Sequence, residues 1–443
     1  MDALLKTVTD VACAIRDRVL PSVDDVEVIA SCADSTGYSV ENDQVIASLT
    51  CGSWSVAMRA MKGGRVATAA TTSRDPGESA DALLRALGAA QAQELAGFLS
   101  PREGTDLRRA DAATWALVDD PAALRSMAVA MRDGAWAQRK GVVVEGEVSA
   151  SRSRRALVTG RGGPLTSAET YHGAFVMLDG NDWDATSSRA PRSEAVPTLG
   201  SALAASLPAR EVTVAEFLGG PREVDAVLHP RMLEGLLRAL LLERVGLDRV
   251  LAGISPAKLG DALAHPRFEL WDDTASLALA GHASDDEGME GARKVILRAG
   301  VLTTLLADQR SALRAGTAPT GNGFRIPILA EDRAEAPVRV GMGHLEVAAG
   351  DIPREALTKG RALLIPDLLG VHSANKSTGA FNNPIVGGLA LEDGVPVARL
   401  KAGAWSATGS FYEILKGAER LSRERMDTGT ATLPWIAARV RVA

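Results

Sequence analysis

A change of pattern near residue 212 is the feature that most limits how this chain can fold. Beyond it, one segment, roughly Pro230–Leu251, carries a dense apolar face at helical spacing, and short apolar runs separated by tight turns follow. Arg298-Ala299-Gly300 and Glu392-Asp393-Gly394 are turns of the kind that join hairpin strands. One long helix followed by a run of hairpins predicts a β-rich domain over residues 212–443, with a strongly curved, barrel-like sheet.

The first 211 residues mix helices with hairpins. Leu4, Val8, Val11, Ile15 and Val19 have the spacing of an amphipathic helix. Alternating residues from 54 to 60, the turn at 62–65 and the run at 66–72 predict a hairpin, and a helix should follow from residue 76 to 95. We therefore expect an N-terminal α+β unit with an antiparallel sheet and flanking helices over residues 1–115.

A second α+β unit is expected over residues 116–211. A helix should run from Pro121 to about Lys140, with strands at 142–149 and 156–159. The stretch 183–210 is rich in Ser, Ala, Pro and Arg, so we interpret it as the connection into the last domain, although residues 199–207 are also compatible with a helix. The fold class predicted for the whole chain is α+β.

Charge and cysteine content limit which classes of partner and which cellular compartment we expect. The chain of 443 residues has a formal net charge of −6 and no basic patch with interleaved aromatic residues, which argues against nucleic acid as a partner. Charged residues interrupt the first twenty positions, so we expect neither a signal peptide nor a membrane span. Cys13, Cys32 and Cys51 are an odd number without CxxC spacing, which favours reduced thiols and a cytoplasmic location.

A search for general catalytic motifs yields little. The sequence contains no GxxxxGK[ST], no GxSxG and no HExxH, and its six histidines are scattered, so we expect no zinc site built from them. Those histidines are His172, His229, His265, His282, His344 and His372. One local cluster, His282 with Asp285, Asp286 and Glu287, has oxygen ligands for a hard cation. Consecutive carboxylates on a solvated turn are the simpler interpretation, which we favour.

Several segments together resemble the TldD/PmbA (TldD/TldE) metallopeptidase family. Residues 284–325 contain a DDEG turn, Asp285-Asp286-Glu287-Gly288, then a hairpin and a TGNG loop, Thr320-Gly321-Asn322-Gly323. Residues 360–418 are similar to the family's tail of strand, STG-type turn, hairpin and final helix, and SWSVAMRAMKGGRVATAATTS is similar to its first-domain hairpin. We regard the DDEG and TGNG loops as possible substrate or interface loops.

In this family, the resemblance implies, catalytic subunits carry HExxxH on a helix and a later Cys as zinc ligands. Residues five apart on an ideal α-helix differ by roughly 140° around its axis, so the motif requires a break or distortion, which a Gly can permit. The corresponding residues here are Leu242, Glu243, Gly246 and Leu247, and the tail beyond residue 423 contains no Cys. Leucine has no lone pair for zinc, so we expect no metal and no catalytic residue in this chain.

The resemblance therefore implies a TldE/PmbA-like subunit. Such a chain would pair with a TldD-type HExxxH subunit that carries zinc, and the heterodimer would cleave amide bonds in short or modified peptides or in N-acylated small molecules. This chain would form part of the chamber and would be inactive alone. Two alternatives stay open: a stand-alone hydrolase that uses residues 282–287 or an unrecognised site, and a non-enzymatic binding or scaffold protein.

Overall fold

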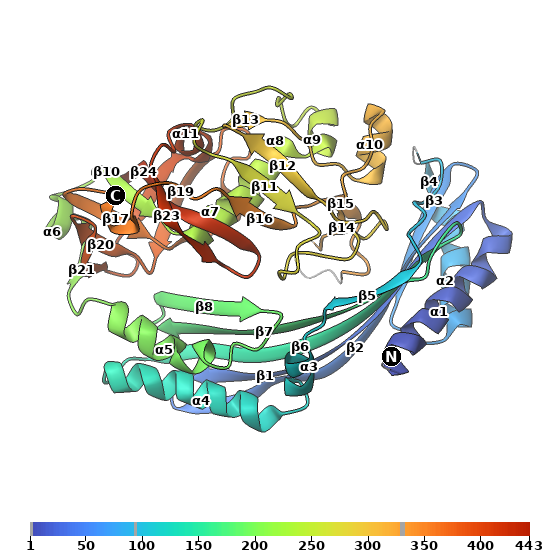
Figure 1. Cartoon of the computed structure of the whole chain (residues 1–443), viewed down its shortest axis with the longest axis horizontal. Coiled ribbons are helices and arrows are strands. Elements are labelled where there is room, and N and C mark those ends of the chain that lie inside the picture. The colour runs from blue at the N-terminus through green and yellow to red at the C-terminus, as the bar shows by residue number, and fades with distance from the viewer. Residues whose placement is uncertain (1–2, 93–94, 328–332) are drawn as a thin grey trace.

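Two large β-sheets, each with helices packed against it, make up the fold, which confirms the predicted α+β class (Figure 1). The computed structural model describes residues 3–92, 95–327 and 333–443. The N-terminal sheet lies beneath the C-terminal half of the chain in Figure 1, and four of its helices lie on the side away from that half. Those helices are α1 (Ala3–Val19), α2 (Pro76–Ala86), α4 (Pro121–Gln138) and α5 (Ala195–Ser206).

The N-terminal sheet has the strand order β4-β3-β2-β1-β6-β7-β5, with β8 paired to β7. Its strands are β1 (Asp25–Glu41), β2 (Gln44–Lys62), β3 (Arg65–Thr71), β4 (Gln91–Ala92), β5 (Gly104–Arg109), β6 (Val144–Thr159), β7 (Leu165–Leu178) and β8 (Asp182–Ser188). The predicted hairpin is β2–β3, which turns at Gly63 and Gly64, both with positive φ. Because β1 pairs with β6 and β5 with β7, the division expected at residue 115 runs through one sheet.

Alternation along the long strands gives this sheet one apolar face. Even-numbered residues such as Val28, Val56 and Val158 are buried in one cluster under α1 and α2. Farther along the same strands, a second cluster forms under α4 and α5 around Val144 and Val176. The stretch 183–210 is therefore not a plain connection, as we had interpreted it, because it contains most of β8 and the whole of α5. The short helix α3 (Ala112–Leu117) precedes α4.

The second sheet is built around β24 (Ala431–Val442), the last strand of the chain, which pairs with four others. Its main path is β13-β12-β11-β16-β24-β10-β17-β20-β21-β9, with β18, β19, β22 and β23 attached beside it. This branched path has two free ends among the described residues, so it does not confirm a barrel-like closure. The hairpins predicted at 295–305 and 388–400 are β12–β13 and β20–β21.

The bounds of the remaining elements are as follows. The strands are β9 (Glu211–Val212), β10 (Arg222–Leu228), β11 (Leu270–Asp273), β12 (Arg293–Arg298), β13 (Val301–Leu302), β14 (Gly323–Arg325), β15 (Val338–Val340), β16 (His344–Val347), β17 (Arg361–Ile365), β18 (Asp367–Leu368), β19 (Ala380–Val386), β20 (Leu389–Glu392), β21 (Val395–Leu400), β22 (Ser406–Ser410) and β23 (Leu421–Asp427). The helices are α6 (Val214–Leu218), α7 (Pro230–Leu236), α8 (Leu242–Val245), α9 (Leu247–Leu251), α10 (Gln309–Ala315) and α11 (Phe411–Lys416). No helix in the described part of the chain is long and apolar enough to cross a membrane.

The helix predicted over Pro230–Leu251 is interrupted. A π-helical turn, Leu237–Leu241, joins α7 to α8, and Gly246 then leaves the helical conformation with φ −73° and ψ 121°. The backbone of Leu306 pairs here, because its N–H donates to Val245 O at 2.8 Å and its carbonyl accepts from Leu247 N at 2.8 Å. A π-turn and a Gly are recognised causes of helix distortion. The prediction of a single long helix was therefore wrong, because the backbone of Leu306, which is distant in the chain, takes up hydrogen bonds that would otherwise continue the helix.

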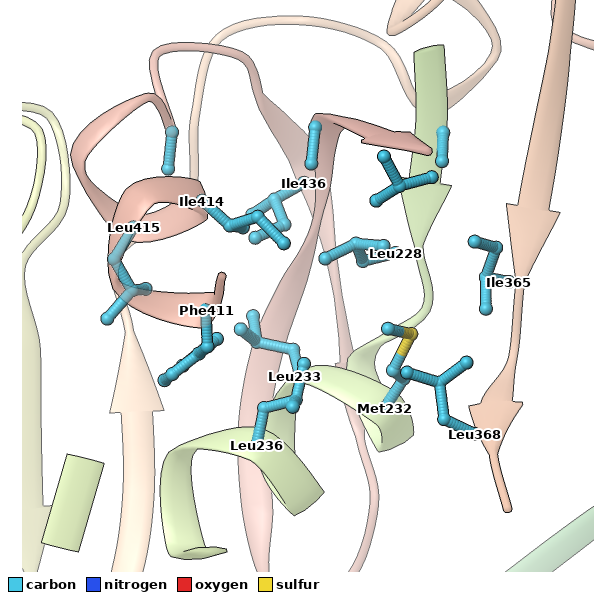
Figure 2. Close-up of a cluster of buried hydrophobic side chains, with 14 of the residues drawn as sticks. Leu228, Met232, Leu233, Leu236, Ile365, Leu368, Phe411, Ile414, Leu415 and Ile436 are labelled. Atoms are coloured by element: carbon cyan, nitrogen blue, oxygen red, sulfur yellow. The ribbon is translucent and has the colours of Figure 1, made fainter. Parts of the chain in front are cut away.

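The first part of this interrupted helix is held in the largest core cluster of the molecule. Figure 2 shows side chains from α7, β10, β17, β18, α11 and β24 gathered there. The labelled residues are Leu228, Met232, Leu233, Leu236, Ile365, Leu368, Phe411, Ile414, Leu415 and Ile436, and all of them are buried. The dense apolar face that the sequence shows in this segment is thus its contact with the second sheet.

Candidate functional site

The two positions that the resemblance aligns with zinc-binding histidines hold leucines in apolar surroundings. Leu242 is partly buried and packs on the main core cluster of the C-terminal half. Leu247, with 7% of its surface exposed, lies in a separate small cluster with Ala307 and Ala312, against Leu251 and Leu305. Neither side chain has a donor atom, and the two contact different clusters. The residues present at this place therefore do not fit a zinc ion.

Glu243, between these leucines, is engaged in ion pairs. Its Oε2 lies 3.5 Å from Nε of Arg249, and its Oε1 lies 3.4 Å from Nζ of Lys376. Only 14% of the Glu243 side chain is exposed. A general base needs a free carboxylate within hydrogen-bonding reach of the proton that it removes. Two cations already neutralise this carboxylate, so its contacts are those of a structural residue.

The turn at residues 375–379 is held against the interrupted helix by contacts of Arg244 and Tyr412. The guanidinium of Arg244 lies over the ring of Tyr412, 4.2 Å from its centroid, and also donates to the carbonyl of Ser377. The hydroxyl of Tyr412 lies 3.0 Å from Leu240 O and 2.7 Å from Lys376 O, so its one proton is donated to one of these carbonyls or shared between them. These contacts fix the shape of the helix, and none of them needs a metal ion.

The acidic turn at 285–287 is buried, which corrects our interpretation of it as a solvated turn. Asp285, Asp286 and Glu287 expose only 2%, 3% and 2% of their surface. Backbone N–H groups and arginines replace water around them. Asp285 alone accepts from the N–H groups of Glu287, Met289 and Gly323 at 2.9–3.0 Å. Buried carboxylates persist only when they are hydrogen-bonded or paired in this way.

The DDEG turn and the TGNG loop form one unit. Asp286 N donates to Gly323 O at 2.8 Å, and Arg325 N donates to Asp286 Oδ2 at 2.7 Å. A Cβ at Gly323 would lie 2.4 Å from an oxygen of Glu287, so this close approach requires a glycine. Gly288 and Gly321 have φ of +87° and +70°, which favour glycine for conformational reasons. The sequence analysis singled out these loops, and the structure brings them together.

Within the TGNG loop, the polar side chains hold the loop itself. Asn322 is fully buried, and its Nδ2 donates to Asp272 Oδ2 at 2.8 Å and to Gly341 O at 2.9 Å. Its Oδ1 accepts from the hydroxyl of Thr320 at 2.7 Å. The hydrogen-bonding capacity of the amide is therefore used internally, which leaves Asn322 and Thr320 with structural contacts.

Three arginines complete the site, two of them from the N-terminal sheet, and none of them was among the residues predicted from the sequence. Arg59 contacts both oxygens of Glu27, at 2.8 and 2.6 Å, and lies 3.4 Å from Glu287. Arg155 and Arg333 lie 3.0 and 3.2 Å from Asp286. A signal was present, because Glu27 and Arg59 occupy central strand positions where a charged residue is rarely buried without a partner.

Burial and these arginines act in opposite directions on the three carboxyl groups. Burial raises the pKa of Asp285 to about 7 and the pKa of Glu287 to about 8, against the lowering effects of backbone N–H groups and of Arg59 respectively. Burial also acts to raise the pKa of Asp286, but Arg333 and Arg155 outweigh it and hold that pKa well below its usual range. Asp286 is therefore the charged member of the turn, and its neighbours tend to hold protons.

A hard cation does not fit this cluster. Arginines contact Asp286 and Glu287, and backbone N–H groups occupy Asp285. His282 does not join the carboxylates of the turn: its Nδ1 lies 3.5 Å from Glu169, and its ring packs against Phe324. In residues 3–92, 95–327 and 333–443, no group of three or more His, Cys, Asp or Glu side chains is arranged to hold a metal ion.

The other histidines lie apart from this cluster. His172 is buried and His229 is partly buried, and burial lowers the pKa of each imidazole, to about 4 and about 3. His229 caps α7, because its Nδ1 accepts from Arg231 N, and His172 accepts from Arg192 N in the same way. His344 is buried in β16, while His265 and His372 lie at partly and fully exposed positions.

Comparison with known proteins shows which family and which solved structures the chain is similar to. The family model for the PmbA/TldA metallopeptidase C-terminal domain matches residues 221–443. A curated "Metalloprotease" of Methanothermobacter thermautotrophicus is 30% identical over 100 residues, and this match spans only 22% of each chain. Among solved structures, TldE of Thermococcus kodakarensis has a TM-score of 0.83 at 21% identity, with 97% of this chain and 100% of that chain covered.

A second solved structure has the same fold. A putative modulator of a DNA gyrase from Thermotoga maritima has a TM-score of 0.78 at 18% identity and covers 97% of this chain and 99% of its own. The structural matches show that the fold extends over both sheets, and the family match covers half of the chain, including the interrupted helix and the acidic turn. This chain belongs to the PmbA/TldD metallopeptidase family.

Proposed function

We propose that this chain is the zinc-free subunit of a heterodimeric TldD/TldE-type hydrolase. Its partner would be a TldD-type chain that carries HExxxH and the zinc ion. The pair would cleave amide bonds in short or modified peptides or in N-acylated small molecules, in the cytoplasm. This chain would contribute a wall of the shared chamber and part of the substrate site, and it would be inactive alone.

The observation that carries the proposal is the interrupted helix. It keeps the break at Gly246 and a glutamate at position 243, but Leu242 and Leu247 contact apolar clusters where ligands would be needed. Glu243 is held by Arg249 and Lys376. A fold that retains the shape of a metal-binding helix without any of its ligands suits a subunit that supports catalysis elsewhere. The similarity to a TldE structure supports the same assignment.

A stand-alone hydrolase built on residues 282–287 receives less support. The three carboxylates of the turn are buried and engaged with arginines or backbone N–H groups. A general acid or base must reach the substrate, and none of these carboxylates is exposed. We therefore assign the acidic turn to the joining of the two halves of the chain and keep the heterodimer as the proposed function.

Co-expression with a TldD-type protein tests the proposal. Obligate interfaces commonly bury more than about 2,000 Å² in total, so the pair should elute as one species in size-exclusion chromatography at micromolar concentration. Amide hydrolysis should require both chains. Two separate monomers and full activity of the partner alone would contradict the proposal. A stable pair without any hydrolytic activity would favour a scaffold role instead.

A further inference from the structure

The face of the N-terminal sheet that is turned toward the C-terminal half carries several polar side chains beside a small apolar cluster, in contrast to its apolar, helix-covered face. Ser55 of β2, Ser31 of β1, Arg155 of β6 and Ser167 of β7 lie side by side in register. They line a cavity of about 190 Å³. Residues of the C-terminal half close it from the other side, namely His282, Asp286, Arg325, Arg333 and Ala334. The cavity therefore lies within one chain, between its two halves.

Two arginines in this cavity have buried nitrogens that lack a hydrogen-bond acceptor among the described residues. In Arg325, which is 6% exposed, these atoms are Nε and Nη2, and in Arg155 the atom is Nε. Nη1 of Arg325 donates to the carbonyls of Ala334 and Ala336, at 3.3 and 3.2 Å. Nε and Nη2 of Arg325 are the pair of N–H groups with which a guanidinium can bind a carboxylate through two parallel hydrogen bonds.

The nearby carboxylates do not fill this edge. Glu27 lies 3.5 Å from Nη2 of Arg325, but its two oxygens are already taken by Arg59. Asp286 is shared between Arg155 and Arg333, and Glu169, which also lines the cavity, pairs with Arg189 and His282. Burial lowers the pKa of Arg325, because a buried guanidinium without a full counter-ion is less stable in its charged form. Water molecules could satisfy the hydrogen bonds in a cavity of this size but not the charge, so a small anion is the better occupant.

We propose that this cavity binds the carboxylate group of a small organic acid, with Arg325 as the bidentate partner and Arg155 as the second. The serine hydroxyls in the wall then hydrogen-bond a polar body, such as an amide, attached to that carboxylate. This binding site needs no metal and no second subunit, so it stands independently of the proposed heterodimer.

Calorimetric titration of the full chain tests the proposal, with N-acetylglycine as the probe. Its neutral analogue N-acetylglycinamide and inorganic phosphate serve as comparison ligands. N-acetylglycine should bind with a Kd at or below about 1 mM, and the amide should bind at least about tenfold more weakly, because a charge-assisted hydrogen bond is lost. Phosphate binding as tightly as N-acetylglycine, or no binding of N-acetylglycine, would overturn the carboxylate assignment.

Variants locate the site. Arg325→Gln should weaken N-acetylglycine binding about tenfold or more. Since loss of a buried arginine can impair folding, Ser153→Leu provides a second route: Ser153 lines the cavity, and a larger side chain there reduces its volume while both arginines remain. Ser151→Leu, two residues away on β6 and not among the described residues that line the cavity, is the matched control. Unchanged affinity in folded Arg325→Gln or in Ser153→Leu would overturn the assignment of the site.

Discussion

Two regions of this molecule, the interrupted helix and the acidic turn, differ in the side chains that they bury. In the interrupted helix, the positions expected to bind a metal are apolar, and the remaining Glu243 is paired with Arg249 and Lys376 at 3.5 and 3.4 Å. In the acidic turn, three carboxyl groups stay buried: arginines from the other half of the chain contact Asp286 and Glu287, and backbone N–H groups contact Asp285. The first region keeps an interrupted helix without metal ligands, and the second buries carboxyl groups where the two halves of the chain meet.

The difference indicates at which positions a substitution should change the free energy of unfolding most. Breaking a buried ion pair leaves an uncompensated charge, whereas breaking an exposed pair costs little. The acidic turn should therefore respond strongly to single substitutions, the apolar positions of the interrupted helix should respond to loss of volume, and Glu243 should respond hardly at all.

The largest expected effect is that of Arg59→Met. This change leaves Glu27 and Glu287 buried without their shared guanidinium, which is expected to cost about 3–5 kcal/mol of unfolding free energy. Denaturant unfolding measures it. Arg108→Met is the matched control, because Arg108 pairs with Asp106 at the surface with 71% of its side chain exposed, and it should change stability by less than about 1 kcal/mol. Equal effects of both variants would remove the contrast drawn here.

Leu247→Ala should destabilise the chain by about 2–5 kcal/mol, because it opens a cavity between α9 and α10 beside Ala307 and Ala312. Leu369→Ala, at a leucine that is 64% exposed, is the control and should be nearly neutral in the same denaturant assay. A neutral Leu247→Ala would show that this position does not carry the packing that we assign to it.

The pH dependence of stability should reveal the buried carboxyl groups. Because the folded-state pKa of Glu287 is raised to about 8, folded protein keeps a proton that unfolded protein has lost, and stability falls as pH rises from the ordinary carboxyl range to about 8. Glu287→Gln should make this fall shallower. Unfolding of both proteins at pH 5, 6.5 and 8 measures the effect of Glu287 together with its neighbour Asp285, since contributions of groups that do not interact with Glu287 cancel in the difference. A steeper fall in the variant would contradict the assignment.

The smallest expected effect is that of Glu243→Gln. Its two ion pairs are long, at 3.5 and 3.4 Å, the Lys376 side chain is 55% exposed, and Gln keeps the volume and a carbonyl acceptor, so stability should change by less than about 1 kcal/mol. In a reconstituted pair, turnover should stay within a few-fold of wild type, while the equivalent change in the partner should lower it by about 10²–10⁴, the usual cost of losing a general base. An assembled but inactive Glu243→Gln pair would mean that this helix takes part in the chemistry.

Local patterns predicted much of the fold. The amphipathic N-terminal helix, the hairpins around Gly63-Gly64 and at 388–400, and the α+β class follow from periodicity and turn residues that act over a few positions. The joining of residues 1–115 and 116–211 in one sheet did not, because β1 and β6 are separated by more than a hundred residues in the chain. Sheet order is set by long-range pairing, which no local pattern specifies.

The candidate site divides in the same way. The absence of ligands at Leu242 and Leu247 could be recognised from the sequence alone, because side-chain chemistry decides it. The environment of the acidic turn could not, since Arg59 is separated from Glu287 by 228 positions. Likewise, the break at Gly246 depends on the backbone of Leu306, which is distant in the chain. Burial and ion pairing are properties of the assembled fold.

The zinc content of the purified chain, expressed without its partner, tests the central claim most directly. After exhaustive dialysis, elemental analysis should find far less than stoichiometric zinc, because Leu242 and Leu247 provide no donor atoms and the residues described show no other metal-binding group. The double variant Leu242→Ala/Leu247→Ala should give the same value. About one zinc per wild-type chain would contradict the account, because it would require a complete set of ligands that this chain is held to lack.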